Sequence, residues 1–470
     1  MSNIISNPTK IKEGFFLKKF DSGYLLIKTL PWTVLFLNRN EVKPAIDQII
    51  NSGNKKPNKY HITNRLFCIL KQEGFLSPME IPEDDYYVAL LILTTLCNMQ
   101  CKYCFAGENR YGFGKKIMDK KVIDSTLNFL AKKIILLKKN KPIIERVELG
   151  LFFFGGEPLL TFDKIKYATK KALKISQSLS KRLKINVKPA LAITTNGTLL
   201  TEEIAKFLEE NNIEVNISID GPDNDKFRIY PDGRGTLKDV KRGIEILKKH
   251  NLKIRVNCVV PPQHMKNIER VAKWFIKEII DDPKGKIRIT FSLERGRVGL
   301  KIKPNYSPEN YKCKYSQKYL KKYTKVVIKL IKKGYDIYTT KLLRKIESGG
   351  TYSRCGAGTQ ELCVVPDGTV FPCHNFIDDN FKLGNITNPK FSPTPKLLKK
   401  FKERNVCSLD PCKKCWLQSI CISAFDCPSH SYYDIGNFHK IESNICQCGY
   451  KIQSQILEKL IHEKLKNKND

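Results

Sequence analysis

The sequence reads CNMQCKYC from residue 97 to residue 104, which spaces Cys97, Cys101 and Cys104 as C-x3-C-x2-C. An apolar, β-branched run at 87–95 comes directly before it and has the length of a buried strand. The cysteines are therefore expected on the loop that leaves this strand, at the sheet edge where α/β folds place their chemistry. Three thiolates on one loop can bind three irons of a four-iron cluster and leave the fourth iron open. Zinc usually takes four protein ligands, and no good fourth ligand lies nearby.

Strands and helices alternate from residue 86 to residue 294. Segments with the character of buried strands lie at 87–95, 146–154, 189–195, 213–219, 253–260 and 286–293. Amphipathic helical segments lie between them, at 119–138, 161–178, 201–211, 236–250 and 264–280. Such βα units predict an α/β domain with a parallel sheet that is curled or closed.

Residues 1–85 predict a small α+β unit. Short strands are expected at 15–20, 24–29 and 33–38, followed by helices at 41–51 and 64–73. So few elements bury little core alone, so the unit either packs on the next domain or receives a peptide by strand addition. Packing on the next domain is the simpler expectation.

The chain after residue 294 divides into three further segments. Residues 295–348 are read as a polar linker followed by a long helix over 313–334. Periodicity weakens and cysteines concentrate at 349–450, which predicts a small domain organised by metal rather than by a large core. Residues 451–470 predict a Lys-rich helix or tail.

The composition is that of a globular chain with a strong positive charge. The 470 residues are 41% hydrophobic, and 83 Lys and Arg against 47 Asp and Glu give a formal charge of +36. Most lysines lie in amphipathic segments such as 240–251 and 319–333, where they form a solvated face, so an acidic peptide is a better partner than nucleic acid. No apolar run is long enough for a membrane span or signal peptide, so we expect a cytoplasmic protein whose clustered cysteines bind metal.

The second predicted strand ends in FFFGGEP, residues 152–158. Gly155 and Gly156 would let a ligand approach the backbone closely, and Glu157 supplies an anion where the strand ends. The sequence Gly-Gly-Glu-Pro often forms a simple turn. Their position one βα unit after the cysteine loop favours a binding site.

The C-terminal cysteines are spaced like metal ligands. The pattern is G-x4-C at 368–373, C-x2-C-x5-C-x5-C at 412–427, and C-x-C at 446–448. The cysteines of this part are Cys355, Cys363, Cys373, Cys407, Cys412, Cys415, Cys421, Cys427, Cys446 and Cys448. Two sets of four thiolates could bind either two zinc ions or two iron-sulfur clusters.

Taken together, these motifs resemble the radical S-adenosylmethionine (SAM) enzymes. The cysteine loop with an aromatic residue before its last cysteine, GGEP at 155–158, TNGT at 195–198 and SIDGP at 218–222 follow the order of that family over about two hundred residues. The resemblance implies a partial (β/α)6, TIM-like barrel in which SAM chelates the open iron of a 4Fe-4S cluster. Reductive cleavage of SAM then gives methionine and a 5′-deoxyadenosyl radical, which abstracts hydrogen from a substrate.

The resemblance also implies which residues contact SAM. Gly155, Gly156 and Glu157 would meet the methionine amino group. The remaining contacts would be Tyr103 at the adenine region, Ser218 and Asp220 at the ribose, and Arg228 at the carboxylate. For Ser218 or Arg228 alone, a strand cap or a surface ion pair is an equal alternative.

The C-terminal pattern resembles the SPASM extension of radical SAM enzymes, which holds two auxiliary 4Fe-4S clusters. It implies Cys355, Cys363, Cys373 and Cys427 as ligands of the first cluster. It implies Cys412, Cys415, Cys421 and either Cys446 or Cys448 as ligands of the second. The spacing from Cys421 to Cys427 is wider than the usual x3 of the family, and Cys407 could replace a wrongly assigned ligand.

SPASM members commonly modify peptides, so the leading hypothesis is a maturase of a ribosomally made peptide or small protein. Its partners would be that peptide, with a leader docking on residues 1–85, and a low-potential electron donor such as a ferredoxin or flavodoxin. Sulfatase-maturing relatives carry an acid where this chain has His374, which weakens a formylglycine product but leaves His374 as a possible proton acceptor or a structural hydrogen-bonding group. The alternatives are oxidation or rearrangement of a small molecule and, more remotely, a non-catalytic nucleic-acid-binding protein.

Overall fold

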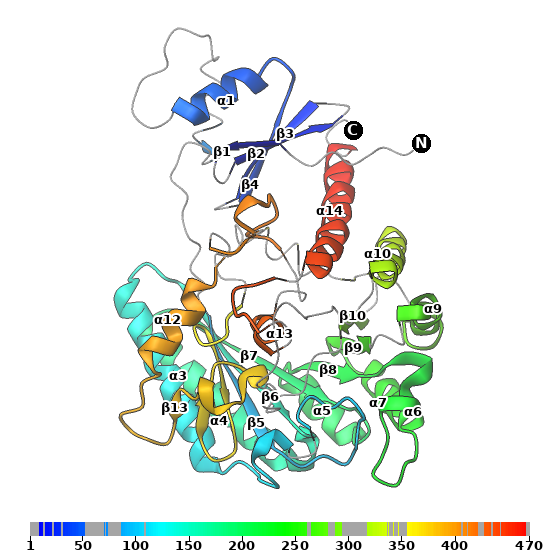
Figure 1. The fold of residues 1–470 in the computed structure, drawn as a ribbon. Coiled ribbons are helices and arrows are strands. Elements are labelled where there is room, and N and C mark those ends of the chain that lie inside the picture. The colour runs from blue at the N-terminus through cyan, green and yellow to red at the C-terminus, as the bar shows by residue number, and fades with distance from the viewer. Residues whose placement is uncertain are drawn as a thin grey trace.

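The computed structural model describes most of the chain. The described residues are 9–12, 15–20, 23–29, 32–51, 70, 72–73, 86–107, 110–260, 265–280, 287–293, 317–335, 337, 342, 346, 355–405, 408–410, 412–421, 427–433, 436–441 and 443–466. Figure 1 shows a large lower body built on one sheet, with a smaller antiparallel sheet above it.

The large sheet has nine strands in the order β10-β9-β8-β7-β6-β5-β11-β12-β13. The strands β5 to β10 are parallel and follow one another in chain order. Their bounds are β5 Tyr86–Thr94, β6 Arg146–Gly155, β7 Asn186–Thr195, β8 Glu214–Ser218, β9 Ile254–Val260 and β10 Ile287–Leu293. All six lie within a few residues of the predicted strands. Because β10 ends the row rather than pairing with β5, the sheet is an open, partial barrel, which confirms the predicted fold class.

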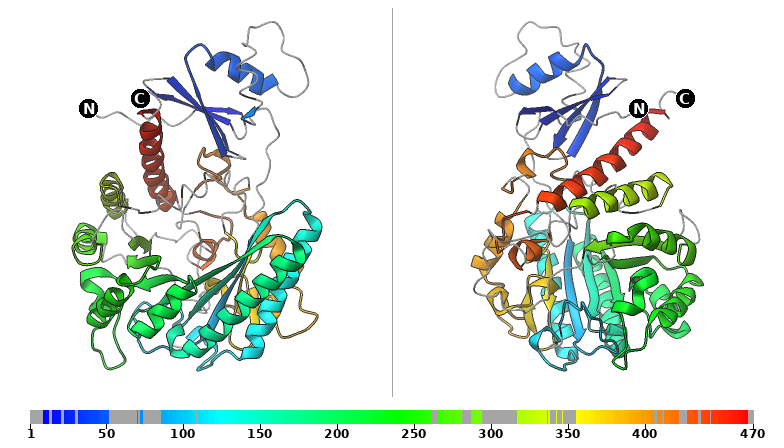
Figure 2. Two further views of the ribbon diagram at one scale, coloured as in Figure 1. Left: turned by 180° about the vertical axis from the view of Figure 1, so that it is seen from behind. Right: turned by 45° about the vertical axis from the view of Figure 1, so that its right-hand side comes forward.

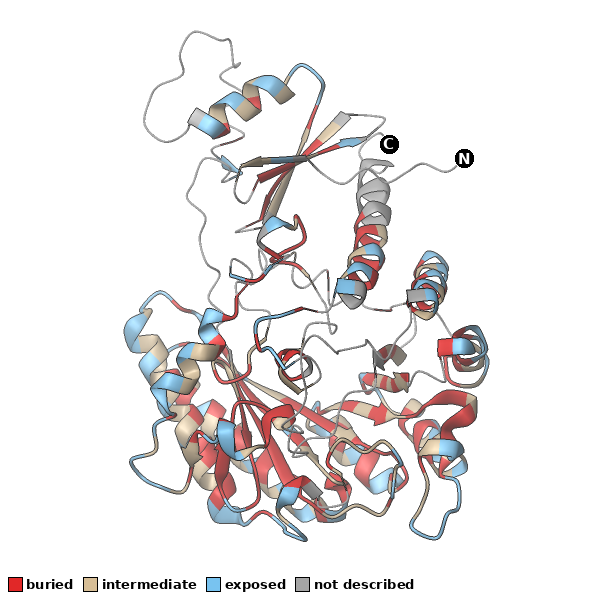
Figure 3. Ribbon diagram, in the orientation of Figure 1, coloured by how far each residue is buried: buried red, intermediate tan, exposed pale blue. Residues whose placement is uncertain are grey.

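Amphipathic helices cover the outer face of this sheet (Figures 1 and 2). They are α3 Lys120–Asn140, α4 Phe162–Leu183, α5 Glu202–Glu210, α6 Asn224–Phe227, α7 Leu237–Lys248 and α9 Ile268–Glu278. In α7 the buried Val240, Ile244 and Leu247 recur every three or four residues, so one face of the helix meets the sheet. Burying each such side chain stabilises the fold by about 1.5–3 kcal/mol. Figure 3 shows the strands as the buried centre of the body.

The cysteine-rich part extends the same sheet, which the sequence did not predict. β11 (Glu361–Val364) lies parallel beside β5, and β12 (Thr369–Phe371) and β13 (Gly384–Asn385) continue antiparallel from it. Cys363 is aligned with Leu90 of β5 on one side and Phe371 of β12 on the other. The start of this domain is therefore built onto the edge of the barrel.

The N-terminal unit is a four-stranded antiparallel sheet with one helix across it. Its elements are β1 Thr9–Lys12, β2 Phe15–Phe20, β3 Gly23–Thr29, β4 Trp32–Leu37 and α1 Val42–Asn51. Three strands and α1 lie where predicted, and β1 is additional. Most of the helix predicted at 64–73 lies outside the described residues. A small core that includes Leu26, Leu37 and Ile49 joins the helix to the sheet.

The N-terminal sheet packs on the C-terminal domain. The Gln418 amide donates a hydrogen bond to the Thr29 hydroxyl, and both groups are buried. The Lys18 ammonium lies 5.4 Å from the centre of the Trp416 ring, within cation–π range. The sequence predicted packing on the next domain, whereas these contacts are with the C-terminal cysteine region.

Four further helices belong to the second half of the chain. They are α10 Gln317–Lys332, α12 Pro395–Glu403, α13 Pro428–Tyr433 and α14 Ser443–Lys466. α10 packs along α14, and α14 begins before residue 450, so the predicted C-terminal tail is the later part of one longer helix. The domain limits drawn from the sequence stay a prediction. None of the described helices is long and apolar enough to span a membrane.

Candidate active site

The cysteine loop leaves β5 at the carboxyl edge of the parallel sheet, as predicted. Its backbone is tied to the end of α6 and the residues after it, because the Gln100 and Lys102 amides donate to the carbonyls of Ile229 (2.8 Å) and Phe227 (2.9 Å). A turn inside the loop is closed by the Cys104 amide and the Cys101 carbonyl at 3.1 Å. The loop therefore has a defined shape supported from the far side of the barrel.

Burial makes the Cys97 and Cys101 thiols poor thiolates on their own. Burial raises the pKa of Cys97 to about 12, although the Met99 amide donates to its sulfur at 3.4 Å. Burial raises the pKa of Cys101 to about 11, and the nearby Arg228 guanidinium opposes this shift. Bound iron supplies the positive charge that stabilises such thiolates. This donor set, with an amide and a guanidinium facing the sulfurs, fits an iron-sulfur cluster.

Close approaches of the chain's own backbone require glycine at positions 155 and 156, and the predicted contact of Gly155 and Gly156 with SAM stays a prediction. Gly155 has φ +145°, and a Cβ built there would lie 2.3 Å from the Thr94 carbonyl oxygen. A Cβ on Gly156 would lie 2.2 Å from the Leu96 carbonyl oxygen. The Gly156 amide donates to the Thr94 carbonyl at 2.8 Å. The glycines thus bring the end of β6 against the residues that lead into Cys97.

Glu157 is fully buried and links the ends of two strands. Its Oε1 accepts from the Leu159 amide (3.0 Å) and the Thr195 hydroxyl (2.7 Å), and its Oε2 accepts from the Asn196 amide at 2.7 Å. Burial raises the pKa of Glu157 to about 7, and these three donors act in the opposite direction. The carboxylate therefore holds the end of β6 to the end of β7, while its predicted contact with a SAM amino group stays a prediction.

Asparagine and threonine side chains connect the cysteine loop to β7. The Asn98 side-chain amide donates to the Thr198 hydroxyl at 2.9 Å. The Asn196 side-chain amide donates to Asn98 Oδ1 at 2.8 Å. The Asn196 amide also lies 4.0 Å from the Cys97 sulfur. The sequence showed TNGT after a strand but assigned these side chains no role, and their place at a strand end was the available signal.

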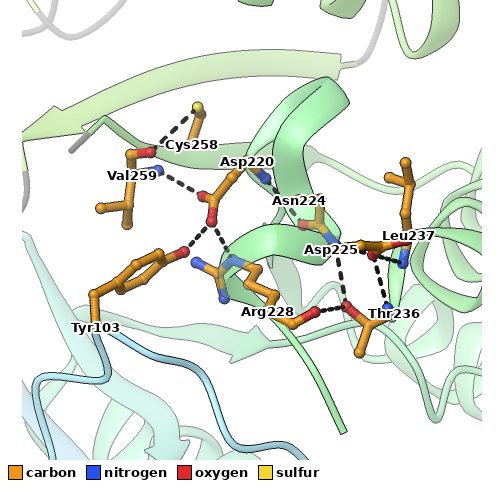
Figure 4. A network of polar contacts seen from close by, with 9 residues as sticks. All are labelled: Tyr103, Asp220, Asn224, Asp225, Arg228, Thr236, Leu237, Cys258 and Val259. Carbon is orange, nitrogen blue, oxygen red and sulfur yellow. Dashed lines mark hydrogen bonds and ion pairs between the residues drawn. The ribbon is translucent and has the colours of Figure 1, made fainter. Parts of the chain in front are cut away.

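Tyr103, Asp220 and Arg228 form one buried polar group between the cysteine loop and β8 (Figure 4). Asp220 Oδ2 accepts from Arg228 Nε at 2.8 Å and from the Tyr103 hydroxyl, and Oδ1 accepts from the Val259 amide at 3.0 Å. Arg228 also lies 5.3 Å from the centre of the Tyr103 ring. Burial opposes the charge on Arg228, yet Asp220, Tyr103 and Cys101 hold its pKa above the ordinary value. We call these three residues the Asp220 network.

The Asp220 network is fixed by residues that sequence reasoning missed. The Asp220 backbone amide donates to Asn224 Oδ1 at 3.2 Å, and the Asn224 side-chain amide donates to the Thr236 hydroxyl at 3.1 Å. That hydroxyl donates to the Arg228 carbonyl at 2.9 Å, and Asp225 Oδ1 accepts the Thr236 amide at 2.8 Å (Figure 4). The Asn-Asp pair at 224–225, four residues after Asp220, was the available sequence signal.

The predicted SAM contacts of this group stay predictions. Tyr103, Asp220 and Arg228 do lie together beside Cys101, while Ser218 is half-buried at the end of β8. Asp220 is fully buried and already accepts three hydrogen bonds, which makes it a positioning residue for Tyr103 and Arg228.

His374 lies beside the first cysteine loop although it comes from the C-terminal domain. Its ring centre is 5.6 Å from that of Phe105 and 5.1 Å from that of Phe154 at the end of β6. The two domains therefore meet at this imidazole, and its role as a proton acceptor stays a prediction.

The first C-terminal set brings three of its four predicted cysteines together. Cys355 and Cys373 share an aromatic cluster with Phe376 and Phe401. Asn375 contacts two sulfurs: its backbone amide donates to Cys373 at 3.4 Å and its side-chain amide to Cys427 at 3.8 Å. Burial, with the Cys427 thiolate also contributing, raises the pKa of Cys355 to about 12.

Cys363 lies in a different apolar cluster. Its neighbours there include Leu90, Tyr111 and Phe371, on the face of the sheet that also contacts Phe105. Cys355 and Cys373 belong to the aromatic cluster instead. The role of Cys363 as a ligand of the first auxiliary cluster therefore stays a prediction.

The second set separates Cys446 from Cys448. Cys446 packs with Cys412, Leu409 and Ile441. Cys448 faces the other way, 3.0 Å from the Thr324 hydroxyl in the interface between α14 and α10. This packing favours Cys446 over Cys448, and the choice between them stays a prediction.

The other cysteines of this set lie as follows. Cys415 follows the short turn of Cys412, and the Gln453 amide of α14 donates to the Cys421 sulfur at 3.4 Å. Cys407 lies outside the described residues. Among the described residues, no three His, Cys, Asp or Glu side chains are spaced to hold one metal ion. The assignment therefore rests on the thiol donor sets.

Comparison with known proteins identifies the families of both domains. Residues 91–275 match the Radical SAM superfamily, and residues 355–416 match SPASM, an iron-sulfur cluster-binding domain. The chain is 27% identical over 352 residues to a cysteine-type anaerobic sulfatase-maturating enzyme of Clostridium perfringens, covering 69% of this chain and 84% of the relative. It is 25% identical over 364 residues to the radical SAM cyclopropyl synthase TigE of Paramaledivibacter caminithermalis, covering 72% of this chain and 68% of the relative.

Solved structures agree with this assignment. The structure of native anSMEcpe with bound AdoMet superposes with a TM-score of 0.58 at 25% identity, covering 80% of this chain and 98% of the other. The cysteine loop, the strand-end motifs and the second cysteine-rich domain thus all belong to one known architecture. The chain is a member of the radical SAM superfamily with a C-terminal SPASM domain, and it binds a 4Fe-4S cluster with SAM in its barrel and auxiliary iron-sulfur clusters in its SPASM domain.

Proposed function

We propose that this radical SAM enzyme is a maturase, which abstracts a hydrogen atom from a ribosomally made peptide or small protein and so modifies it after translation. The observation that carries the proposal is the likeness to anSMEcpe solved with bound AdoMet and the Cp18Cys peptide, with a TM-score of 0.56 and 25% identity over 98% of that chain. The cysteine-type sulfatase-maturating relative and TigE support the same class of reaction.

In this proposal the residues at the strand ends prepare the site for SAM. When bound, the 4Fe-4S cluster supplies the electron that cleaves SAM to methionine and a 5′-deoxyadenosyl radical. Cys97, Cys101 and Cys104 would bind three of its irons. Gly155, Gly156 and Glu157 fix the end of β6 beside Cys97, and the glycine backbone is the part left to meet the SAM amino group.

On the opposite side of the cysteine loop, the Asp220 network would orient SAM. Asp220 holds the Tyr103 hydroxyl and the Arg228 guanidinium in place, so that the Tyr103 ring can border the adenine region and Arg228 can reach a carboxylate. Ser218, half-buried at the end of β8, is the proposed ribose contact. His374, beside Phe105 and Phe154, is the proposed proton acceptor.

The SPASM domain would carry electrons away from the substrate, because a cluster with full protein ligation suits outer-sphere transfer. Cys355, Cys373 and Cys427 support a first cluster, and Cys412, Cys415, Cys421 and Cys446 a second. The expected external partner is a low-potential donor such as a ferredoxin or flavodoxin in the cytoplasm.

The N-terminal sheet is the proposed docking element for a leader segment. β1 and β4 are the outer strands of this sheet, and an outer strand can pair with an extended peptide. The contacts of Thr29 with Gln418 and of Lys18 with Trp416 place this sheet against the segment that follows Cys415. A bound leader would therefore be held near the SPASM domain.

The proposal is tested with reconstituted full-length enzyme, SAM, dithionite and the peptide encoded beside it, under anaerobic conditions. We expect formation of 5′-deoxyadenosine and a modified peptide in mass spectrometry, with loss of two hydrogens indicating a crosslink or an oxidation. Cys101→Ala should abolish both products. Formation of 5′-deoxyadenosine with small-molecule substrates but with none of the candidate peptides would favour the alternative small-molecule activity and contradict the proposal.

A further inference from the structure

A carboxylate lies among the cysteines of the first auxiliary set. Glu361 begins β11, two residues before Cys363, and strand alternation puts both side chains on one face of the hairpin. Across the hairpin, Cys363 pairs with Phe371, so Phe371 and Cys373 share that face. Glu361 is therefore nearer than Cys363 to the end of the hairpin that carries Cys373.

Backbone hydrogen bonds bring Glu361 to both Cys355 and Cys373. The Glu361 amide donates to the Gly356 carbonyl at 2.8 Å, which sets it beside the residue that follows Cys355. The Gly358 amide is shared between the Glu361 carbonyl (2.9 Å) and the Pro372 carbonyl (3.1 Å). One N–H thus joins Glu361 to the residue before Cys373. The loop from 356 to 361 therefore brings Glu361 close to both Cys355 and Cys373 along the backbone.

The charge of Glu361 is not balanced by any cation in the described part of the chain. Among the described residues, none donates a hydrogen bond to its carboxylate or forms an ion pair with it. The residue is half-buried, at the end of the hairpin that carries Cys373. Enclosed carboxylates are ordinarily paired with a cation or bound to metal, because removing an unpaired charge from water is costly.

We propose that Glu361 is the fourth protein ligand of the auxiliary cluster held by Cys355, Cys373 and Cys427, in place of Cys363. Cys363 is completely buried in the apolar cluster that includes Leu90 and Phe371, where a thiol acts as a small hydrophobic side chain. Glu361 instead borders the pair of thiols that share the aromatic cluster. The cluster would have three thiolate ligands and one carboxylate ligand, and its remaining iron would be bound through oxygen.

The test uses the full chain with Cys97, Cys101 and Cys104 replaced by Ala, so that only auxiliary clusters remain. This background should bind about eight irons in two 4Fe-4S clusters. We expect Glu361→Gln to lose at least one iron and to show the EPR signal of a three-iron cluster after mild oxidation. Cys363→Ala should keep the iron content and the Mössbauer spectrum of the background. Glu361→Cys should restore a complete four-iron cluster.

Each other outcome overturns the assignment. A three-iron signal in Cys363→Ala, alone or together with Glu361→Gln, would make Cys363 a ligand. An unchanged spectrum in Glu361→Gln would show that its carboxylate does not bind iron. If Glu361→Gln loses the whole first cluster, failure of Glu361→Cys to recover it would refute ligation. The second cluster serves as an internal check of folding, and none of these measurements depends on the substrate.

Discussion

Replacing Asp220 by Asn should destabilise the barrel strongly while barely changing its shape. The Asp220 side chain is fully buried, and that of Arg228 is 9% exposed. Both carboxylate oxygens face donors: Arg228 and Tyr103 at Oδ2, and the Val259 amide at Oδ1. An amide has a single acceptor oxygen. If this oxygen keeps the Val259 bond, the NH2 group faces the Arg228 guanidinium and leaves a buried positive charge without its partner.

Breaking a buried ion pair on one side typically costs 3–5 kcal/mol, so we expect about 4 kcal/mol for Asp220→Asn. For a domain of this size that corresponds to a melting temperature lower by roughly 10 °C. The assay is thermal unfolding of reconstituted protein, followed by far-UV circular dichroism without oxygen. Because Arg228 also lies beside Cys101, we further expect less iron bound by the barrel.

The matched control is Asp232→Asn. Arg234 Nε donates to Asp232 Oδ2 at 2.7 Å, which is nearly the same bond, but the two side chains are 73% and 53% exposed. Exposed pairs contribute little, so this change should lower the melting temperature far less than Asp220→Asn does. Equal melting temperatures for Asp220→Asn and Asp232→Asn would refute the reasoning that burial of the Asp220 network stabilises this site.

Three further changes test other parts of the structure. Gly156→Ala places a Cβ 2.2 Å from a backbone oxygen and should lower the free energy of unfolding by about 3 kcal/mol. The control Gly233→Ala, at φ +85° with no atom within 4 Å, should lower it by about 1 kcal/mol. Equal unfolding temperatures of the two variants would refute the packing argument. The His250 imidazolium donates hydrogen bonds to the Glu209 and Glu202 carboxylates, which raises its pKa above 6.5. It therefore stabilises the fold fully below about pH 6.5, and this contribution is lost as the pH rises through the folded-state pKa. His250→Gln should therefore cost up to about 1 kcal/mol at about pH 5.5 and much less at about pH 9, as measured by urea unfolding, and a pH-independent cost would contradict this. Cys446→Ala should lose the second auxiliary cluster in iron analysis while Cys448→Ala keeps it, and the reverse result would overturn the choice made from their packing.

Local patterns predicted the barrel well because each βα unit carries its own signal. The run at 87–95 and the periodic residues Val240, Ile244 and Leu247 bury one side of each element wherever the sheet lies. Pairing of β11 with β5 could not be predicted, since a strand of four residues has no periodicity to read and its partner is far away in the sequence. Distant contacts decide such edges.

The candidate site was predictable in its motifs but not in its connections. The sequence pointed to Glu157 because it follows a strand and to Asp220 through the family resemblance. Only the fold shows that Glu157 holds Thr195 and that Asp220 holds Arg228. Likewise the sequence around Glu361 does not have the spacing of a metal-ligand motif, because the closeness of Glu361 to Cys373 depends on a turn and on hairpin register. Side-chain partners across elements are set by three-dimensional packing.

Deuterium transfer tests directly whether this enzyme takes hydrogen from a peptide. Reconstituted enzyme is given SAM, dithionite and the candidate peptide prepared with fully deuterated residues, and the 5′-deoxyadenosine formed is analysed by mass spectrometry. We expect deuterium in the 5′-deoxyadenosine and a matching loss from the peptide, both absent with Cys101→Ala. Active cleavage of SAM that never incorporates deuterium, with every candidate peptide supplied, would contradict a peptide substrate.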